Sequence, residues 1–140
     1  MVSVANPMAK ILIVDDDPDI VEAMRMPLEA NHYQVVSASS AKEGLQKILK
    51  ERPDLVILDV MMETTTEGFH FAYKLRSEAP DSPYKDFREL PILMITAIHR
   101  TTSFRFSPRT DEGFLPVEDL VEKPIEPRVL LEKVSHLLKK

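Results

Sequence analysis

The sequence predicts an α/β fold with a parallel sheet between two layers of helices. Short apolar runs alternate along the chain with longer amphipathic segments, as in consecutive β–α units. Most of the apolar runs are continuous, which is typical of strands that are buried on both faces. With 140 residues the chain is long enough for one domain with its own core. We therefore expect a doubly wound sheet with right-handed crossovers.

Five apolar runs are the expected strands. The first, third and fourth read KILIVD, DLVILDV and PILMITA, and each contains at least four consecutive apolar residues. The second, YQVVSA, and the last, DLVEKP, are less apolar. The five runs occupy residues 10–15, 33–38, 54–60, 91–97 and 119–124.

Four amphipathic segments between and after these runs are the expected helices. They occupy residues 18–30, 40–52, 68–78 and 127–140. In the first, Pro27 should kink the helix and Asn31 should take the left-handed position that ends it. In the second, Ser40 and Glu43 have the spacing of a capping box, in which each side chain bonds to the backbone near the other.

Composition and charge exclude several classes of protein. The formal net charge of −5 disfavours direct binding to nucleic acid or to an anionic membrane, and the absence of cysteine removes disulfides and thiolate chemistry. No segment has the pattern of a signal peptide or a membrane span, so a cytoplasmic protein is expected. Residues 1–8 precede the periodic pattern and are expected to be a flexible extension, with a single domain over residues 9–140.

Chemically active side chains follow four of the expected strands. Asp15 and Asp16 end the first, Asp59 the third, Thr96 lies at the end of the fourth, and Lys123 at the end of the fifth. In a doubly wound sheet, ligands bind outside the carboxyl ends of the strands. Acidic loop tips are common, but Asp59 follows LVIL beside the expected core, where an unpaired charge is costly. We therefore expect a site at this edge.

These residue types suit a divalent cation and a phosphoryl group. Clustered carboxylates form a hard-oxygen pocket, and Mg²⁺ takes one or two carboxylates, several waters and phosphate oxygens. Lys123 is a point charge that can approach Asp59, and the hydroxyl of Thr96 can donate to a phosphoryl oxygen. A carboxylate between two cations is a competent nucleophile towards phosphorus.

The motifs ILIVDDDPDI, PDLVILDVMM, ILMITA and EKPI, in this order, resemble those of the receiver domain of two-component response regulators. The resemblance runs from about residue 10 to residue 138. It implies a flavodoxin-like, five-stranded sheet with strand order 2-1-3-4-5. It also implies a signalling domain that is no enzyme in the usual sense, because it catalyses only its own phosphotransfer and dephosphorylation.

The resemblance assigns roles to individual residues. Asp59 would accept a phosphoryl group from a sensor histidine kinase, and Thr96 and Lys123 would contact that group. The Lys123–Pro124 peptide bond would be cis. The implied ligands of Mg²⁺ are Asp15, Asp16, Asp59 and the backbone carbonyl of Met61.

The sequence departs from the family pattern in three places that bear on signalling. After Asp59 the chain reads DVMMETTTEGF, so residues 63–66 lengthen a turn that is usually shorter; a threonine or Glu63 could simply close that turn or could contact the metal's water. Residues 98–119 replace the fourth helix with an irregular segment, either a partner-binding loop or a packed loop. Leu120 stands where receivers often have an aromatic residue. We therefore expect rearrangement of residues 98–119 to carry the signal.

Several alternatives remain open. The leading interpretation is a stand-alone receiver that acts on a downstream protein, although a piece of a longer regulator would have the same sequence. A Mg²⁺-dependent phosphohydrolase would need a second acid two residues after the nucleophile, where this chain has Met61. A scaffold with the receiver fold that works without phosphorylation is the third. Met61 and Ile98 would flank the attacking water, and both are apolar, so slow self-dephosphorylation is expected.

Overall fold

The computed structural model describes residues 9–59, 65–96, 118–122 and 124–139; at residues 65–69, 96 and 122 it describes the backbone alone. The extension expected at residues 1–8 lies outside the described residues, as does nearly all of the segment 98–119. The described residues contain no helix that is long and apolar enough to cross a membrane.

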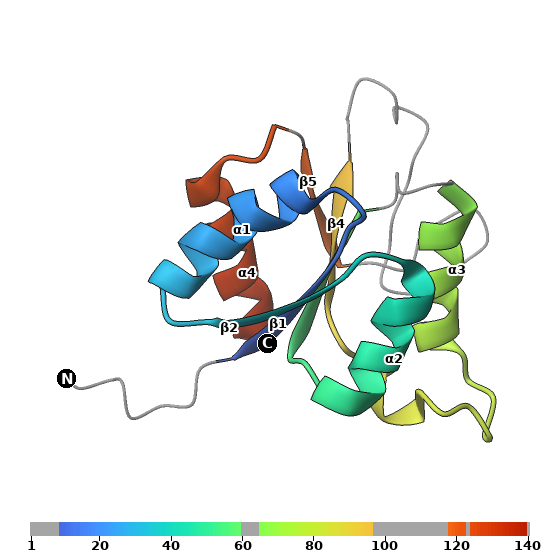
Figure 1. The fold of residues 1–140 in the computed structure, drawn as a ribbon. Helices are drawn as coiled ribbons and strands as arrows, with labels where there is room; N and C mark the ends of the chain where they lie inside the picture. Colours follow the sequence, from blue (N-terminus) through green and yellow to red (C-terminus); the bar gives the residue numbers. More distant parts are fainter. Residues whose placement is uncertain (1–8, 60–64, 97–117, 123, 140) are drawn as a thin grey trace.

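Five strands form one parallel sheet in the order β2-β1-β3-β4-β5 (Figure 1). This order confirms the predicted fold. In the third strand all five residues are buried, which explains its continuous apolar run, because helices cover both faces. The strands are β1 Lys10–Val14, β2 Gln34–Ala38, β3 Leu55–Asp59, β4 Ile92–Thr96 and β5 Asp119–Glu122.

The helices lie on both faces of this sheet. The described helices are α1 Pro18–Ala30, α2 Ala41–Glu51, α3 Thr65–Arg76 and α4 Pro127–Leu138, with a short 3-10 helix, η2, at Lys85–Phe87. Figure 1 shows α1 and α4 on one face and α2 and α3 on the other. The carboxyl ends of the strands therefore remain uncovered by these four helices, at the upper edge of the sheet in this view.

Alternate residues of the strands pack into two separate apolar layers. In β1, Ile11 and Ile13 pack with α1 and α4, whereas Leu12 and Val14 pack with α2 and α3. All four side chains are fully buried. This alternation follows from the two-residue period of a strand, and it ties each strand to both helical layers.

α1 covers the predicted residues 18–30, whereas α2, α3 and α4 differ from their predicted ranges by one to three residues at one or both ends. α3 begins at Thr65, three residues before the expected start, because threonines cost a helix only a few tenths of a kcal/mol each. At the end of α1 the left-handed residue is His32, with φ 73°, and Asn31 has φ −103°. Asn31 instead turns its side-chain amide back to the carbonyl oxygen of Pro27, 2.9 Å away. α1 is continuous through Pro27, and the predicted kink stays a prediction.

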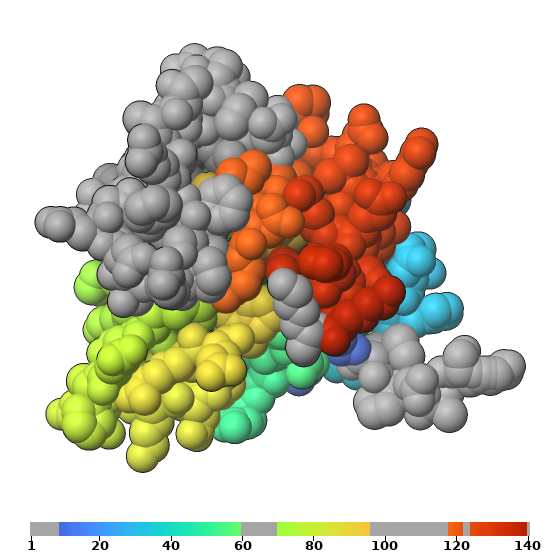
Figure 2. Space-filling view, turned by 180° about the vertical axis from the view of Figure 1, so that it is seen from behind, coloured from blue at the N-terminus to red at the C-terminus, as the bar shows by residue number. Residues whose placement is uncertain are grey.

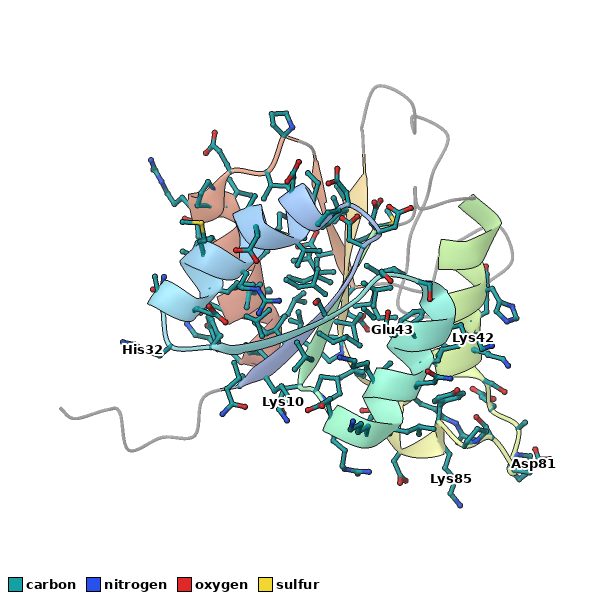
Figure 3. The ribbon with its side chains drawn as sticks, in the orientation of Figure 1. Lys10, His32, Lys42, Glu43, Asp81 and Lys85 are labelled. Atoms are coloured by element: carbon teal, nitrogen blue, oxygen red, sulfur yellow. The ribbon has the colours of Figure 1, made fainter. Side chains whose placement is uncertain are left out.

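The start of α2 has half of the predicted capping box. The hydroxyl of Ser40 accepts a hydrogen bond from the Glu43 amide at 3.1 Å, as predicted. The carboxylate of Glu43, at the first turn of α2 in Figure 3, accepts from the amide and hydroxyl of Ser39 instead of Ser40. These bonds lower the pKa of Glu43. They tie the loop between β2 and α2, which lies beside the site described below, to the helix.

The loop between α3 and β4 is anchored by aromatic side chains. Phe87 is buried in the layer formed with α2 and α3, and Tyr84 packs against the same layer. The guanidinium of Arg52 lies 5.0 Å from the centre of the Phe87 ring, within cation–π range. The aromatic residues of this loop therefore serve as packing anchors.

Candidate metal site at the carboxyl ends of the strands

Three carboxylates meet where β1 and β3 end. Asp15 and Asp16 follow β1, and Asp59 is the last residue of β3. The two strands are adjacent, with Val14 paired to Leu58, so their ends lie side by side. One carboxylate oxygen from each of the three aspartates lies within 4.8 Å of the others. The structure thus brings together the acids that the sequence predicted to share a site.

The three carboxylates differ in their exposure to solvent. Asp15 and Asp59 are each 2% exposed, whereas Asp16 is exposed. Two buried carboxylates this close repel each other strongly unless a cation or a proton compensates their charge. The exposed Asp16 leaves the cluster accessible from solvent.

Backbone bonds fix the turn that carries these acids. The amide of Asp15 donates to the carbonyl of Ala38 at 3.0 Å, which holds the end of β1 against the end of β2. One carboxylate oxygen of Asp15 accepts from the amide of Asp17 at 2.9 Å. Asp17 in turn caps α1 by accepting from the amide of Asp19 at 2.9 Å. The turn is therefore organised locally before any ligand binds.

The chemistry of this cluster fits Mg²⁺. All three donors are hard carboxylate oxygens, and none of the histidines that the structure describes belongs to the cluster. Mg²⁺ keeps several waters, so a partly open group of carboxylates suits it better than a closed protein cage would.

A cleft of about 430 Å³ opens beside the cluster, between α1 and the loop that precedes α2. It is lined on one side by Asp15 and Asp16 and on the other by Ser39 and Glu43, with Arg25 of α1 also in its wall. The cleft therefore gives a small molecule or a partner's side chain a route to Asp15 and Asp16. Sequence reasoning did not single out Arg25.

The other predicted site residues are located only through their backbone or through their place in the chain. Thr96 ends β4, where its neighbour Ile95 pairs with Asp59, and Thr96 itself pairs with Glu122 at the end of β5. Lys123 follows Glu122 in the sequence. Lys123, Met61 and the side chain of Thr96 lie outside the described residues, so their roles stay predictions. The same holds for the cis bond before Pro124.

Sequence reasoning did not find the ion pair with the least exposed arginine among the described residues. Arg76, at the end of α3, pairs with Glu118, just before β5, and the arginine is buried. An arginine at the end of an amphipathic segment and a glutamate before a strand are both ordinary in a sequence. Their pairing across 42 residues becomes visible only in the fold.

Comparison with known proteins places these motifs in a family. A family model described as the response regulator receiver domain matches residues 11–135. The chain is 33% identical over 138 residues to the alkaline phosphatase synthesis transcriptional regulatory protein PhoP of Bacillus subtilis, covering 94% of this chain and 49% of that protein. It is 36% identical over 131 residues to the response regulator MprA of Mycolicibacterium vanbaalenii, covering 94% and 51%. The chain thus spans about half the length of these curated relatives.

Solved structures agree with the sequence comparison. The chemotaxis response regulator CheY4 of Vibrio cholerae superposes with a TM-score of 0.72 at 29% identity, covering 93% of this chain and 98% of that one. A CheY-like response regulator receiver domain protein from Methanospirillum hungatei superposes with a TM-score of 0.69 at 28% identity, covering 94% of each chain.

Proposed function

Because the chain belongs to the response regulator receiver domain family, we propose that it is a switch of a two-component system that is set by phosphorylation of Asp59. The single observation that supports this most is the position of Asp59. It ends a fully buried strand and meets two further carboxylates within 4.8 Å. The proposed phosphodonor is a histidine kinase, and the proposed output is altered binding to a downstream protein.

The proposed reaction is a transfer between two side chains. A carboxylate oxygen of Asp59 attacks the phosphorus of a phosphohistidine and forms an O–P bond. The P–N bond breaks, and its electron pair stays on the imidazole nitrogen. The product on this chain is an acyl phosphate. Asp59 is 2% exposed, so its backbone and the surrounding core hold the attacking carboxylate in a defined place.

Mg²⁺ would be held by Asp15, Asp16 and Asp59, with the backbone carbonyl of Met61 as the further ligand that the family resemblance implies. When bound, the ion supplies positive charge that offsets the carboxylates and the transferring phosphoryl oxygens. Asp15 contributes a fixed carboxylate, because the amide of Asp17 holds it in place. Asp16 contributes an accessible one.

Thr96 and Lys123 are the proposed donors to the phosphoryl group. Thr96 ends β4 and pairs with Glu122 at the end of β5, so its backbone lies at the same edge of the sheet as Asp59, and Lys123 is the next residue in the sequence after Glu122. A threonine hydroxyl and a lysine ammonium supply hydrogen bonds and charge to phosphoryl oxygens. The slow self-dephosphorylation expected from Met61 and Ile98 stays a prediction, because both lie outside the described residues.

Intact mass spectrometry after incubation with MgCl₂ and acetyl phosphate tests this proposal. The protein should gain one phosphoryl group, and EDTA should prevent the gain. Asp59→Asn should gain none. A matched control is Asp81→Asn, which removes the same charge from the outer tip of the loop after α3 (Figure 3) and should be labelled like the wild type. Equal labelling of Asp59→Asn would contradict the assignment, and an unlabelled wild type would favour the phosphorylation-independent scaffold.

A further inference from the structure

A buried ion pair lies at the end of the sheet opposite to the acid cluster. Arg76, the last residue of α3, places Nη2 2.7 Å from one carboxylate oxygen of Glu118 and 2.9 Å from the other. The Arg76 side chain is 4% exposed and that of Glu118 is 20% exposed. Seen from behind, the chain around β5 lies directly beside the segments around η2 and β4 (Figure 2). Both bonds come from the single nitrogen Nη2, and charge-assisted hydrogen bonds of this kind are stronger than those between neutral groups.

The guanidinium of Arg76 is itself held by the main chain. Its Nη1 donates to the carbonyl of Arg88 at 2.8 Å and to the carbonyl of Leu90 at 2.9 Å. These carbonyls belong to the segment that leads into β4. The guanidinium therefore has a fixed position relative to the start of that strand.

Glu118 is bonded twice to Ile92, the first residue of β4. Its carboxylate accepts from the amide of Ile92 at 2.7 Å, and its own amide donates to the carbonyl of Ile92 at 3.0 Å. If the pairing of β5 with β4 extended further towards the start of β4, a main-chain carbonyl would accept the hydrogen bond of the Ile92 amide. The carboxylate of Glu118 takes that place, so the pairing of β5 with β4 begins at a defined residue.

Apart from the ion pair of Asp119 with Lys133 of α4, the sequence of β5 has little else that would fix its alignment with β4. β5 is a four-residue strand at the edge of the sheet, and its two apolar residues, Leu120 and Val121, face opposite layers. Because each layer accepts an apolar side chain, burial alone discriminates weakly between neighbouring registers. A slip of one residue would move the residue after the strand by about 3.3 Å and turn its side chain to the other face.

We propose that Arg76 and Glu118 are positioning residues that set the register of β5 and so determine how Lys123, the next residue after that strand, is presented to a phosphoryl group on Asp59. The expected effect on phosphorylation rests on the proposed function, whereas the role of the ion pair in the register of β5 does not. In another register the carboxylate of Glu118 would move away from the guanidinium of Arg76, and two largely buried charges would lose their partners. That cost selects the pairing in which Leu93 faces Asp119.

The double variant Arg76→Met/Glu118→Gln tests the proposal. It removes both charges and keeps an oxygen that can accept from the Ile92 amide, and neutral replacements of buried ion pairs are often tolerated. We expect a folded protein whose rate of phosphorylation by acetyl phosphate falls roughly tenfold or more, since an ångström of misplacement can cost about 100-fold. Its Mg²⁺ affinity by calorimetry should stay at the wild-type value, because the three acids lie on β1 and β3.

Two matched controls separate positioning from stability. Leu28→Ala truncates a fully buried side chain at the far end of α1, and Lys133→Met removes the half-buried ion pair with Asp119 of β5. Measured at a temperature where each protein is folded, both should be phosphorylated at the wild-type rate. If Leu28→Ala loses as much activity as the double variant, the loss reflects stability and the proposal is wrong.

A direct measurement of how β5 is aligned with β4 tests the proposal without relying on phosphorylation. Backbone nuclear Overhauser effects between Leu93 and Asp119 should be present in the wild type and lost or displaced in the double variant. Preserved contacts between these two residues in the double variant would overturn the proposal, whatever the rate. If the wild type accepts no phosphoryl group, the proposed function fails, whereas displaced contacts in the double variant would still support the role of the pair in the register.

Discussion

Removing the charge of Asp59 should make the protein more stable when no divalent cation is present. Asp15 and Asp59 are each 2% exposed, and their nearest oxygens lie within 4.8 Å. At 4.8 Å, two unit charges repel by about 3.5 kcal/mol for an effective dielectric near 20 and by about 0.9 kcal/mol in bulk water. Asn keeps the shape of the side chain but loses some of the interactions that Asp59 makes. We expect Asp59→Asn to raise the free energy of unfolding by about 2 kcal/mol.

Urea denaturation followed by circular dichroism measures this difference, in EDTA and again in MgCl₂. Mg²⁺ at 100 times its dissociation constant should stabilise the wild type by about 2.7 kcal/mol. The variant lacks one of the three proposed carboxylate ligands and should gain less, so the difference in stability between the two proteins should shrink or reverse. Asp81→Asn, an exposed change of the same charge, should alter stability by less than about 0.5 kcal/mol. An Asp59→Asn protein that is less stable than the wild type in EDTA would refute the idea of a self-repelling cluster.

Two further predictions concern the core and the ion pair. Gly44→Ala should lower the free energy of unfolding by about 1 kcal/mol in urea denaturation, because a β-carbon would lie 2.9 Å from buried atoms of Phe71 and Val14. Overpacking costs about 1–3 kcal/mol, which exceeds the gain of about 1 kcal/mol in helix propensity. A more stable variant would count against this close fit. Burial raises the pKa of Glu118 and Arg76 opposes that rise, so Arg76→Met should raise it further. At a pH between 4.5, the ordinary pKa of glutamate, and the raised pKa, the folded variant holds a proton on Glu118 that the unfolded chain releases. The loss of stability relative to the wild type should therefore be largest at neutral pH and should shrink as the pH falls towards 4.5. A deficit that is constant between pH 5 and 8 in urea titrations would contradict this reasoning.

Local pattern was a good guide to the elements and a poorer guide to their ends. The buried runs that became β1 and β3 were evident because a strand covered on both faces must be apolar throughout. α1 ends at Ala30 as predicted, but the left-handed residue that follows is His32 and not Asn31, whose side chain bonds to the carbonyl oxygen of Pro27. Which residue adopts the left-handed conformation depends on competing hydrogen bonds of similar energy, and the general preferences of residue types do not predict which of these bonds forms.

The sequence by itself determined which residues could share a site. Parallel strands bring their carboxyl ends to one edge, so aspartates that end β1 and β3 meet whatever the details of packing. Only the tertiary structure decided that Asp15 and Asp59 are buried while Asp16 is exposed, and that the three approach within 4.8 Å. It alone revealed the pair of Arg76 and Glu118, because contacts between distant segments depend on how helices and strands are placed against one another, and no local pattern encodes that placement.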